Sequence, residues 1–106
     1  MNRAKKRALK VLKQWIDQKN DYYLAAQEMS LSDFVLDTVL NDDTKPLTVY
    51  SYGKHGYMLH YVDSFTGSGL YDLDGINLEF KSLLAKNNLR AECENDKHFT
   101  IYDLYE

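Results

Sequence analysis

The clearest pattern in the chain is a helical alternation of apolar and basic positions at its start, from Asn2 to Gln18. With about 100° of turn per residue, the apolar positions fall on one broad stripe: Ala4, Ala8, Leu9, Val11, Leu12, Trp15 and Ile16. The basic positions fall on the opposite side: Arg3, Lys6, Arg7, Lys10 and Lys13. This pattern predicts an amphipathic helix that ends near Lys19, with Trp15 buried and Lys6, Lys10 and Lys13 exposed together.

Two further helices are predicted before the only proline. Tyr22 to Met29 indicates a short second helix, and Ser30 to Leu40 a third. The third carries apolar or small residues at helical spacing: Leu31, Phe34, Val35, Thr38 and Val39. Ser30 or Ser32 can cap it, because a hydroxyl oxygen can accept a bond from an N–H of the first helical turn. Asn41 to Pro46 is then a loop.

The segment from Tyr22 to Asn41 resembles the helix-turn-helix pattern of DNA-binding repressors. Ala26 stands where that family has a small residue, and Ser30 where the turn usually has glycine. Apolar residues occupy the packing positions: Ala25, Met29, Leu31, Leu36 and Val39. The face that would read DNA carries Asp33 and Asp37, which repel phosphate. We therefore interpret this segment as a helical hairpin that is structural or contacts protein.

A β-hairpin is predicted next. Leu47 to Tyr52 and Tyr57 to Phe65 alternate as strands do, and they flank Gly53-Lys54-His55-Gly56. If Tyr52 pairs with Tyr57, one face is aromatic and contains Tyr50, Tyr52, Tyr57 and Tyr61 together with Leu59. The other face contains Leu47, Val49, Met58, His60 and Val62. A half-solvated sheet has one polar face, so we expect both faces of this hairpin to be covered.

The rest of the chain predicts one more helix and a second hairpin. Leu70 to Leu73 is a candidate short strand, and a helix follows from Asp74-Gly75 to about Asn87. Strands at Leu89 to Glu94 and His98 to Leu104 segregate their apolar residues when Glu94 pairs with His98 and Cys93 with Phe99. That register gives a core face of Leu89, Ala91, Cys93, Phe99 and Ile101.

These elements predict an α+β fold in a single domain spanning residues 1–106. The expected order is helix, helix, helix, strand, strand, an optional strand, helix, strand, strand. The N-terminal helices would be followed by an antiparallel sheet of four or five strands with one further helix.

Charge is distributed unevenly along the chain, whose formal net charge is −3. Residues 1–19 carry seven Lys or Arg and one acid, a local charge of +6, whereas residues 20–106 carry six and fifteen, a local charge of −9. The basic face of the first helix can therefore remain solvated, dock on the acidic body, or bind an acidic protein or nucleic acid. Nine tyrosines add the amphipathic contact area that is enriched at interfaces.

The sequence contains no recognisable catalytic or metal-binding pattern. Cys93 and His98 fall on opposite faces of the predicted hairpin, and the cysteine and histidines lack a zinc-like double pair. The segment Asp72-Leu73-Asp74-Gly75 has Leu70 and Lys81 where a calcium loop needs carboxylates. We therefore predict no enzyme activity, no metal and no cofactor. A single cysteine and the absence of long apolar runs favour a cytoplasmic protein that does not enter a membrane.

Function is expected to be binding. The first hypothesis is a non-enzymatic regulator or inhibitor that masks a surface of a protein partner, in composition similar to phage or mobile-element inhibitors of host nucleic-acid enzymes. It has two candidate surfaces, the basic helix face (Arg3, Lys6, Arg7, Lys10, Lys13) and the aromatic hairpin face (Tyr50, Tyr52, Tyr57, Tyr61). The alternative is a nucleic-acid-binding protein that uses the basic face. A homodimer that covers the hairpin is also open.

Overall fold

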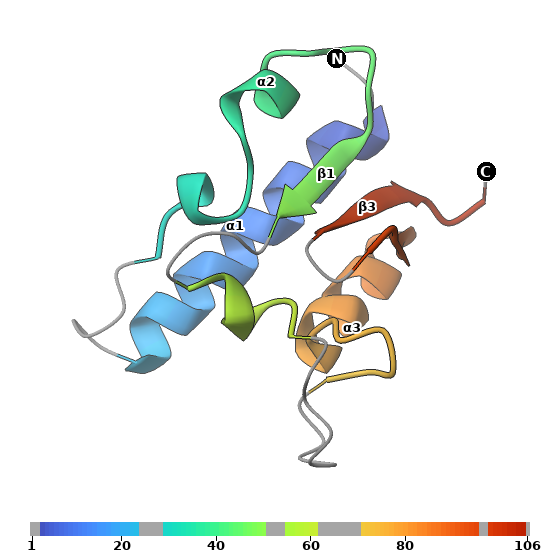
Figure 1. Cartoon of the computed structure of the whole chain (residues 1–106). Coiled ribbons are helices and arrows are strands. Elements are labelled where there is room, and N and C mark those ends of the chain that lie inside the picture. Colours follow the sequence, from blue (N-terminus) through green and yellow to red (C-terminus); the bar gives the residue numbers. More distant parts are fainter. Residues whose placement is uncertain (1–2, 24–28, 51–54, 62–70, 96–97, 106) are drawn as a thin grey trace.

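The protein is a small α+β domain with three helices and a three-stranded antiparallel sheet (Figure 1). The computed structural model describes residues 3–23, 29–50, 55–61, 71–95 and 98–105. The helices are α1 (Arg3–Tyr23), α2 (Asp37–Leu40) and α3 (Leu78–Lys86). The strands are β1 (Leu47–Tyr50), β2 (Leu89–Cys93) and β3 (His98–Asp103), and β3 lies between β1 and β2. The expectation of four or five strands is not confirmed among these residues.

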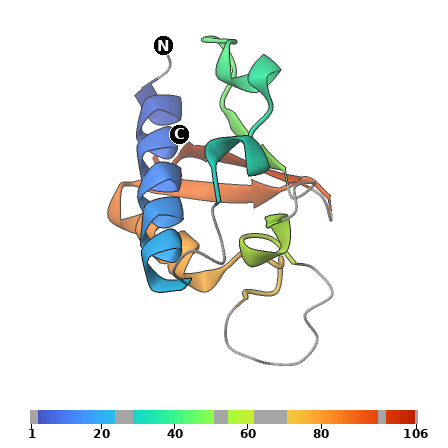
Figure 2. The same cartoon turned by 90° about the vertical axis from the view of Figure 1, so that its left-hand side faces the viewer.

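Helix α1 buries its apolar stripe, as its periodicity predicts. Trp15 is fully buried, and its ring lies edge-on to Phe34 and Phe80, with centroids 5.8 and 6.0 Å away. Figure 2 shows β2 (orange) passing behind α1, while β1 (green) lies to one side of the helix. The helix continues past Lys19 to Tyr23, so the first two residues of the predicted second helix belong to α1. Residues 24–28 of that prediction lie outside the described residues.

The prediction of one helix from Ser30 to Leu40 is wrong. The segment instead forms a 3-10 turn, η2 (Leu31–Asp33), followed by the short helix α2. Between them, at Phe34, the backbone leaves helical geometry. Phe34 is buried, and its carbonyl accepts a hydrogen bond from the backbone N–H of Tyr50 (2.7 Å). This carbonyl is therefore bonded to β1 and not to a following turn of helix. Ser30 donates its N–H to the Asp33 carboxylate (2.9 Å), which closes the turn. A helix-turn-helix motif needs a continuous second helix, and the residues from Ser30 to Leu40 do not form one.

The first predicted hairpin is also wrong. β1 forms where expected, but it pairs with β3, placing Leu47 opposite Ile101 and Val49 opposite Phe99. Gly56–Met58 forms a 3-10 turn, η3, and His60 donates its N–H back to the Gly56 carbonyl (3.0 Å). A local turn thus uses backbone groups that a strand would have offered to β1. His60 makes one isolated bridge, to Ile76. Tyr52 and residues 62–65 lie outside the described residues.

The second hairpin has the predicted register. Cys93 pairs with Phe99, Arg90 pairs with Tyr102, and Glu94 donates its N–H to the His98 carbonyl (3.2 Å). Phe99 and Ile101 of β3 are buried on the side of the two long helices. The expectation that Cys93 lies in the core is wrong, because it stands at the end of an edge strand and is exposed.

Helix α3 starts later than predicted. Asn77 caps it by accepting a bond from the Phe80 N–H (3.0 Å), whereas Asp74 lies in a turn before it and pairs with Lys81 (2.6 Å). Asn88 adopts a left-handed conformation with φ 58°, which ends the helix and turns the chain into β2. In place of the candidate strand from Leu70 to Leu73, the described part shows one isolated bridge, between Tyr71 and Asn77.

Candidate anion-binding face of helix α1

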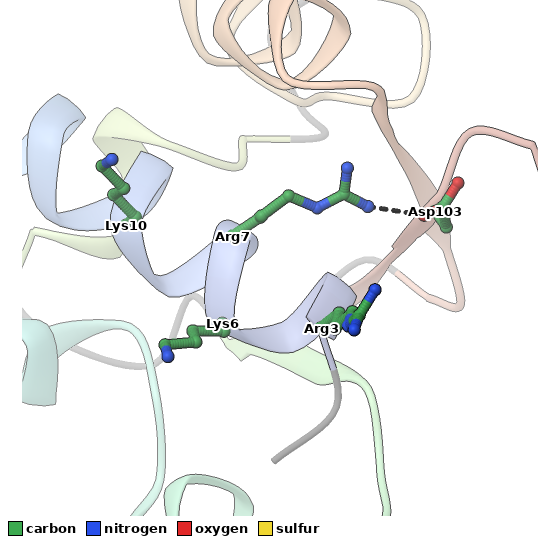
Figure 3. A pocket seen from close by; sticks show the side chains of 5 residues that line it. All are labelled: Arg3, Lys6, Arg7, Lys10 and Asp103. Atoms are coloured by element: carbon green, nitrogen blue, oxygen red, sulfur yellow. Dashed lines mark hydrogen bonds and ion pairs between the residues drawn. The ribbon is translucent and has the colours of Figure 1, made fainter.

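The basic residues predicted from periodicity line a groove on the outer side of α1. The groove has a volume of about 510 Å³ and is lined by Arg3, Lys6, Arg7, Lys10 and Asp103 (Figure 3). Residues three, four and seven positions apart lie on the same face of a helix, which is why α1 gathers these four cations. Asp103 comes from the end of β3 and faces Arg7 across the groove. Lys13 lies further along the same helix and is exposed.

Arg7 is held in place by groups of the C-terminal half of the chain. Its Nη2 lies 2.5 Å from Oδ2 of Asp103, and its Nη1 donates to the Asn87 carbonyl at 3.3 Å. The other carboxylate oxygen of Asp103 accepts the backbone N–H of Tyr105 at 3.0 Å. The Tyr105 N–H, and after it the Arg7 guanidinium, lower the pKa of Asp103. Asp103 therefore stays ionised, and Arg7 has a fixed position.

The other cations of this face make no ion pair or hydrogen bond with any residue in the described part of the chain: Arg3, Lys6, Lys10 and Lys13. Lys19, at the far end of α1, pairs with Glu79 of α3 (2.5 Å). Within the described structure, Arg7 and Lys19 thus pair with acids of the rest of the domain, whereas these four cations do not. The first turn of α1 contains no acid, and the helix dipole adds to the positive potential around Arg3 and Lys6 at this end of the helix.

Lys5 is the one basic residue of this segment that points inward. Its side chain is fully buried, and Nζ donates to the carbonyl oxygens of Val39 and Asp42 at the end of α2. This role was not predicted from the sequence, although a signal for it exists. Lys5 falls on the apolar stripe, one turn before Leu9 and two before Leu12, so its ammonium needs buried acceptors. Lys5 thus fastens the segment around α2 to α1.

Three tyrosines of the predicted aromatic face are described, Tyr50, Tyr57 and Tyr61, and they do not lie on one strand pair; Tyr52 lies outside the described residues. Tyr50 is half-buried on β1, with its ring centroid 5.1 Å from that of His98. Tyr57 and Tyr61 are exposed on the η3 segment, and Tyr71 links them. The Tyr71 hydroxyl donates to the Tyr57 carbonyl (2.7 Å), and its ring lies 6.0 Å from that of Tyr61. The aromatic sheet face does not form among the described residues because residues 57–61 are not a strand.

The cysteine and histidines are arranged for packing and hydrogen bonding. Cys93 Sγ lies 3.6 Å from Nε2 of the buried His60, but the thiol donates to the Asn95 carbonyl (3.0 Å). His60 Nε2 also lies 3.0 Å from the Asp74 carbonyl. His98 is bonded to Glu94 (2.8 Å) on the other face of the sheet. Within the described ranges, no group of three or more His, Cys, Asp or Glu residues could hold a metal ion.

No family model, no curated protein and no solved structure matches this chain. Among the residues that the structure describes, no helix is long and apolar enough to cross a membrane.

Proposed function

We propose that this chain is a non-enzymatic binding protein, a regulator or inhibitor that covers an acidic surface of a protein partner with the basic face of α1. The observation that carries the proposal is the set of four cations on one helix face without an ion-pair partner in the described part of the chain: Arg3, Lys6, Lys10 and Lys13. Three of them, Arg3, Lys6 and Lys10, line a groove of about 510 Å³ together with Arg7 and Asp103, and an anionic group can be held there.

The charge distribution favours a protein over nucleic acid. The basic face runs from Arg3 to Lys13, which is about 15 Å along a helix axis at about 1.5 Å per residue. A compact acidic patch on a protein matches a surface of that length. A long polyanion would continue over a body whose residues 20–106 carry a net −9, and this body would repel it.

Exposed apolar residues also support a protein partner. Tyr57, Tyr61 and Leu73 are exposed in the described structure, and Leu73 is fully so. Aromatic side chains are enriched where proteins meet, because their rings give a large contact area at low cost in conformational entropy. They would supply apolar contacts that the basic face lacks.

The proposal is tested by direct binding of a labelled oligoglutamate peptide, with single-stranded and double-stranded DNA of matched charge as competitors. The double reversal K6E/K10E should weaken oligoglutamate binding about tenfold or more, because it places acids in the groove. The control K45E/K86E makes the same charge change at two exposed lysines that do not line the groove. It should weaken binding much less than K6E/K10E, because exposed charges that do not contact the peptide are screened by salt.

Three results would contradict this proposal. The first is no binding of oligoglutamate by the wild-type protein, and the second is equal losses in K6E/K10E and the control. The third is a clear preference for DNA at equal charge. In that case the groove would bind phosphates, and the chain would be the nucleic-acid-binding protein of the alternative hypothesis.

A further inference from the structure

Asp103 is the one acid among the residues that line the groove, and it binds Arg7 through a single oxygen. Its Oδ2 lies 2.5 Å from Arg7 Nη2, while its Oδ1 accepts the Tyr105 N–H at 3.0 Å. Because Tyr105 holds one oxygen, Asp103 does not form the two parallel bonds that a guanidinium and a carboxylate can make together. Such bidentate pairs are the stronger and more specific arrangement.

Arg7 retains donor capacity that Asp103 leaves unused. Its Nε is buried and has no hydrogen-bond partner among the described residues, and its Nη1 makes only a long bond to the Asn87 carbonyl, at 3.3 Å. A buried N–H without an acceptor is unfavourable, so a second acceptor oxygen at this guanidinium would improve its bonding. Arg7 is therefore fixed in position but incompletely satisfied.

We propose that a carboxylate of the partner binds the Arg7 guanidinium through both of its oxygens and displaces Asp103. In the free protein Asp103 occupies this position, and it therefore competes with the partner. This inference rests on the proposed function, and it names the chemistry that the groove selects. The seated Asp103 carboxylate shows that such a group fits against Arg7 (Figure 3). Arg3, Lys6 and Lys10 surround the same space and would hold further acids of the partner.

Displacement of Asp103 has a small cost in this geometry. Its side chain is about one-quarter exposed (26%), so water can reach the carboxylate once the partner's carboxylate has taken its place at Arg7. The Tyr105 N–H continues to hold Oδ1, which keeps the end of β3 in place. The exchange therefore replaces one single-oxygen ion pair with a two-oxygen pair and leaves the fold unchanged.

The first test compares oligoglutamate binding by wild type, D103N and D21N. Asparagine can still accept the Tyr105 N–H but no longer competes as a charge, so D103N should bind about two- to fivefold more tightly. D21N removes the same charge at an exposed position of α1, about 27 Å from Arg3 at about 1.5 Å per residue. It should leave the affinity unchanged. Unchanged or weaker binding by D103N would overturn the inference, because Asp103 would then only position Arg7.

The second test uses the wild-type protein and does not depend on the folding of a variant. Carboxyl NMR at neutral pH, where both the peptide and Asp103 are ionised, follows the Asp103 side-chain signal as oligoglutamate is added. Since Arg7 lies 2.5 Å from Asp103 Oδ2 in the free protein, this signal should shift when the peptide takes Arg7. An Asp103 carboxyl signal that is unchanged with the peptide bound would overturn the displacement. If K6E/K10E still weakens binding in that case, the proposed function stands and only the competition fails. If wild type does not bind, both fail.

Discussion

The two sides of helix α1 differ in what they do, although they are built from neighbouring residues. The inner side carries Leu12 and Trp15, both fully buried, and even its lysine, Lys5, is buried against two carbonyl oxygens. The outer side carries Lys6 and Lys10, which are exposed and make no ion pair in the described part of the chain. Changes on the inner side should therefore alter stability, and changes on the outer side should alter binding.

The largest expected effect on stability comes from the centre of the inner side. Trp15→Ala removes the ring that lies between Phe34 and Phe80, and it should lower the free energy of unfolding by about 3–5 kcal/mol in urea denaturation. Trp15→Phe is the control, since it keeps an aromatic ring and removes an indole N–H that has no hydrogen-bond partner among the described residues. A loss in W15F as large as in W15A would contradict the packing account.

The second effect separates two adjacent lysines. Lys5→Met should lower the free energy of unfolding by about 1–3 kcal/mol, because it leaves the carbonyl oxygens of Val39 and Asp42 without the buried ammonium. Lys6→Met should change it by less than about 0.5 kcal/mol, because Lys6 is on the surface. Equal effects in the two variants would show that Lys5 is not the buried partner of α2.

A smaller effect is expected at the outer face of the sheet, away from both sides of α1. The Thr100 hydroxyl, and after it His98, lower the pKa of Glu94 below its ordinary value of 4.5. A lowered pKa stabilises the fold above the pKa of the unfolded chain, and this stabilisation disappears as the pH falls through the pKa of the folded protein. Glu94→Gln should thus cost about 0.5 kcal/mol at neutral pH, after allowance for solvent screening.

Urea denaturation of wild type and E94Q across the acid range checks this dependence. The difference between the two proteins should be present at neutral pH and should vanish in acid, once Glu94 is protonated in the folded state. A difference that stays constant through the acid range would contradict an electrostatic origin and would indicate a change in packing.

The smallest effect on stability is expected from the variant with the largest effect on binding. K6E/K10E should change the free energy of unfolding by less than about 0.5 kcal/mol, because both residues are exposed. Urea denaturation of this variant beside wild type is the measurement. A large destabilisation would remove the separation between the two sides of α1, and the loss of binding would then need another explanation.

Elements that depend on local sequence were predictable. Helix α1 follows from the spacing of its apolar stripe, and the register of β2 and β3 follows from a three-residue loop and the segregation of faces. β1 was also predicted, but the helix from Ser30 to Leu40 and the pairing of β1 with residues after Tyr57 were predicted wrongly, because the partners of these segments are distant in sequence. β1 pairs with β3, which places Leu47 opposite Ile101, and Phe34 gives its carbonyl to Tyr50. The spacing of apolar residues within a short segment cannot show which other strand that segment will pair with.

The candidate site was predictable to the same extent. The helical period places Arg3, Lys6 and Lys10 on one side of α1, and these three residues line the groove. The fifth lining residue, Asp103, lies 96 positions from Arg7 in the sequence, so only the fold brings them to 2.5 Å. The buried position of Lys5 could have been found from its place on the apolar stripe, whereas its acceptors at Val39 and Asp42 could not.

The most direct test of the basic face is a map of the amides that change when oligoglutamate is added to the wild-type protein, followed by NMR. The account predicts the largest shifts at the outer residues of α1 from Arg3 to Lys13, with a second group at Asp103 and Tyr105. Tyr50, Tyr57 and Tyr61 should change little, because an acidic peptide has no basic groove to bind there. Shifts centred on those tyrosines, with α1 unaffected, would contradict the central claim.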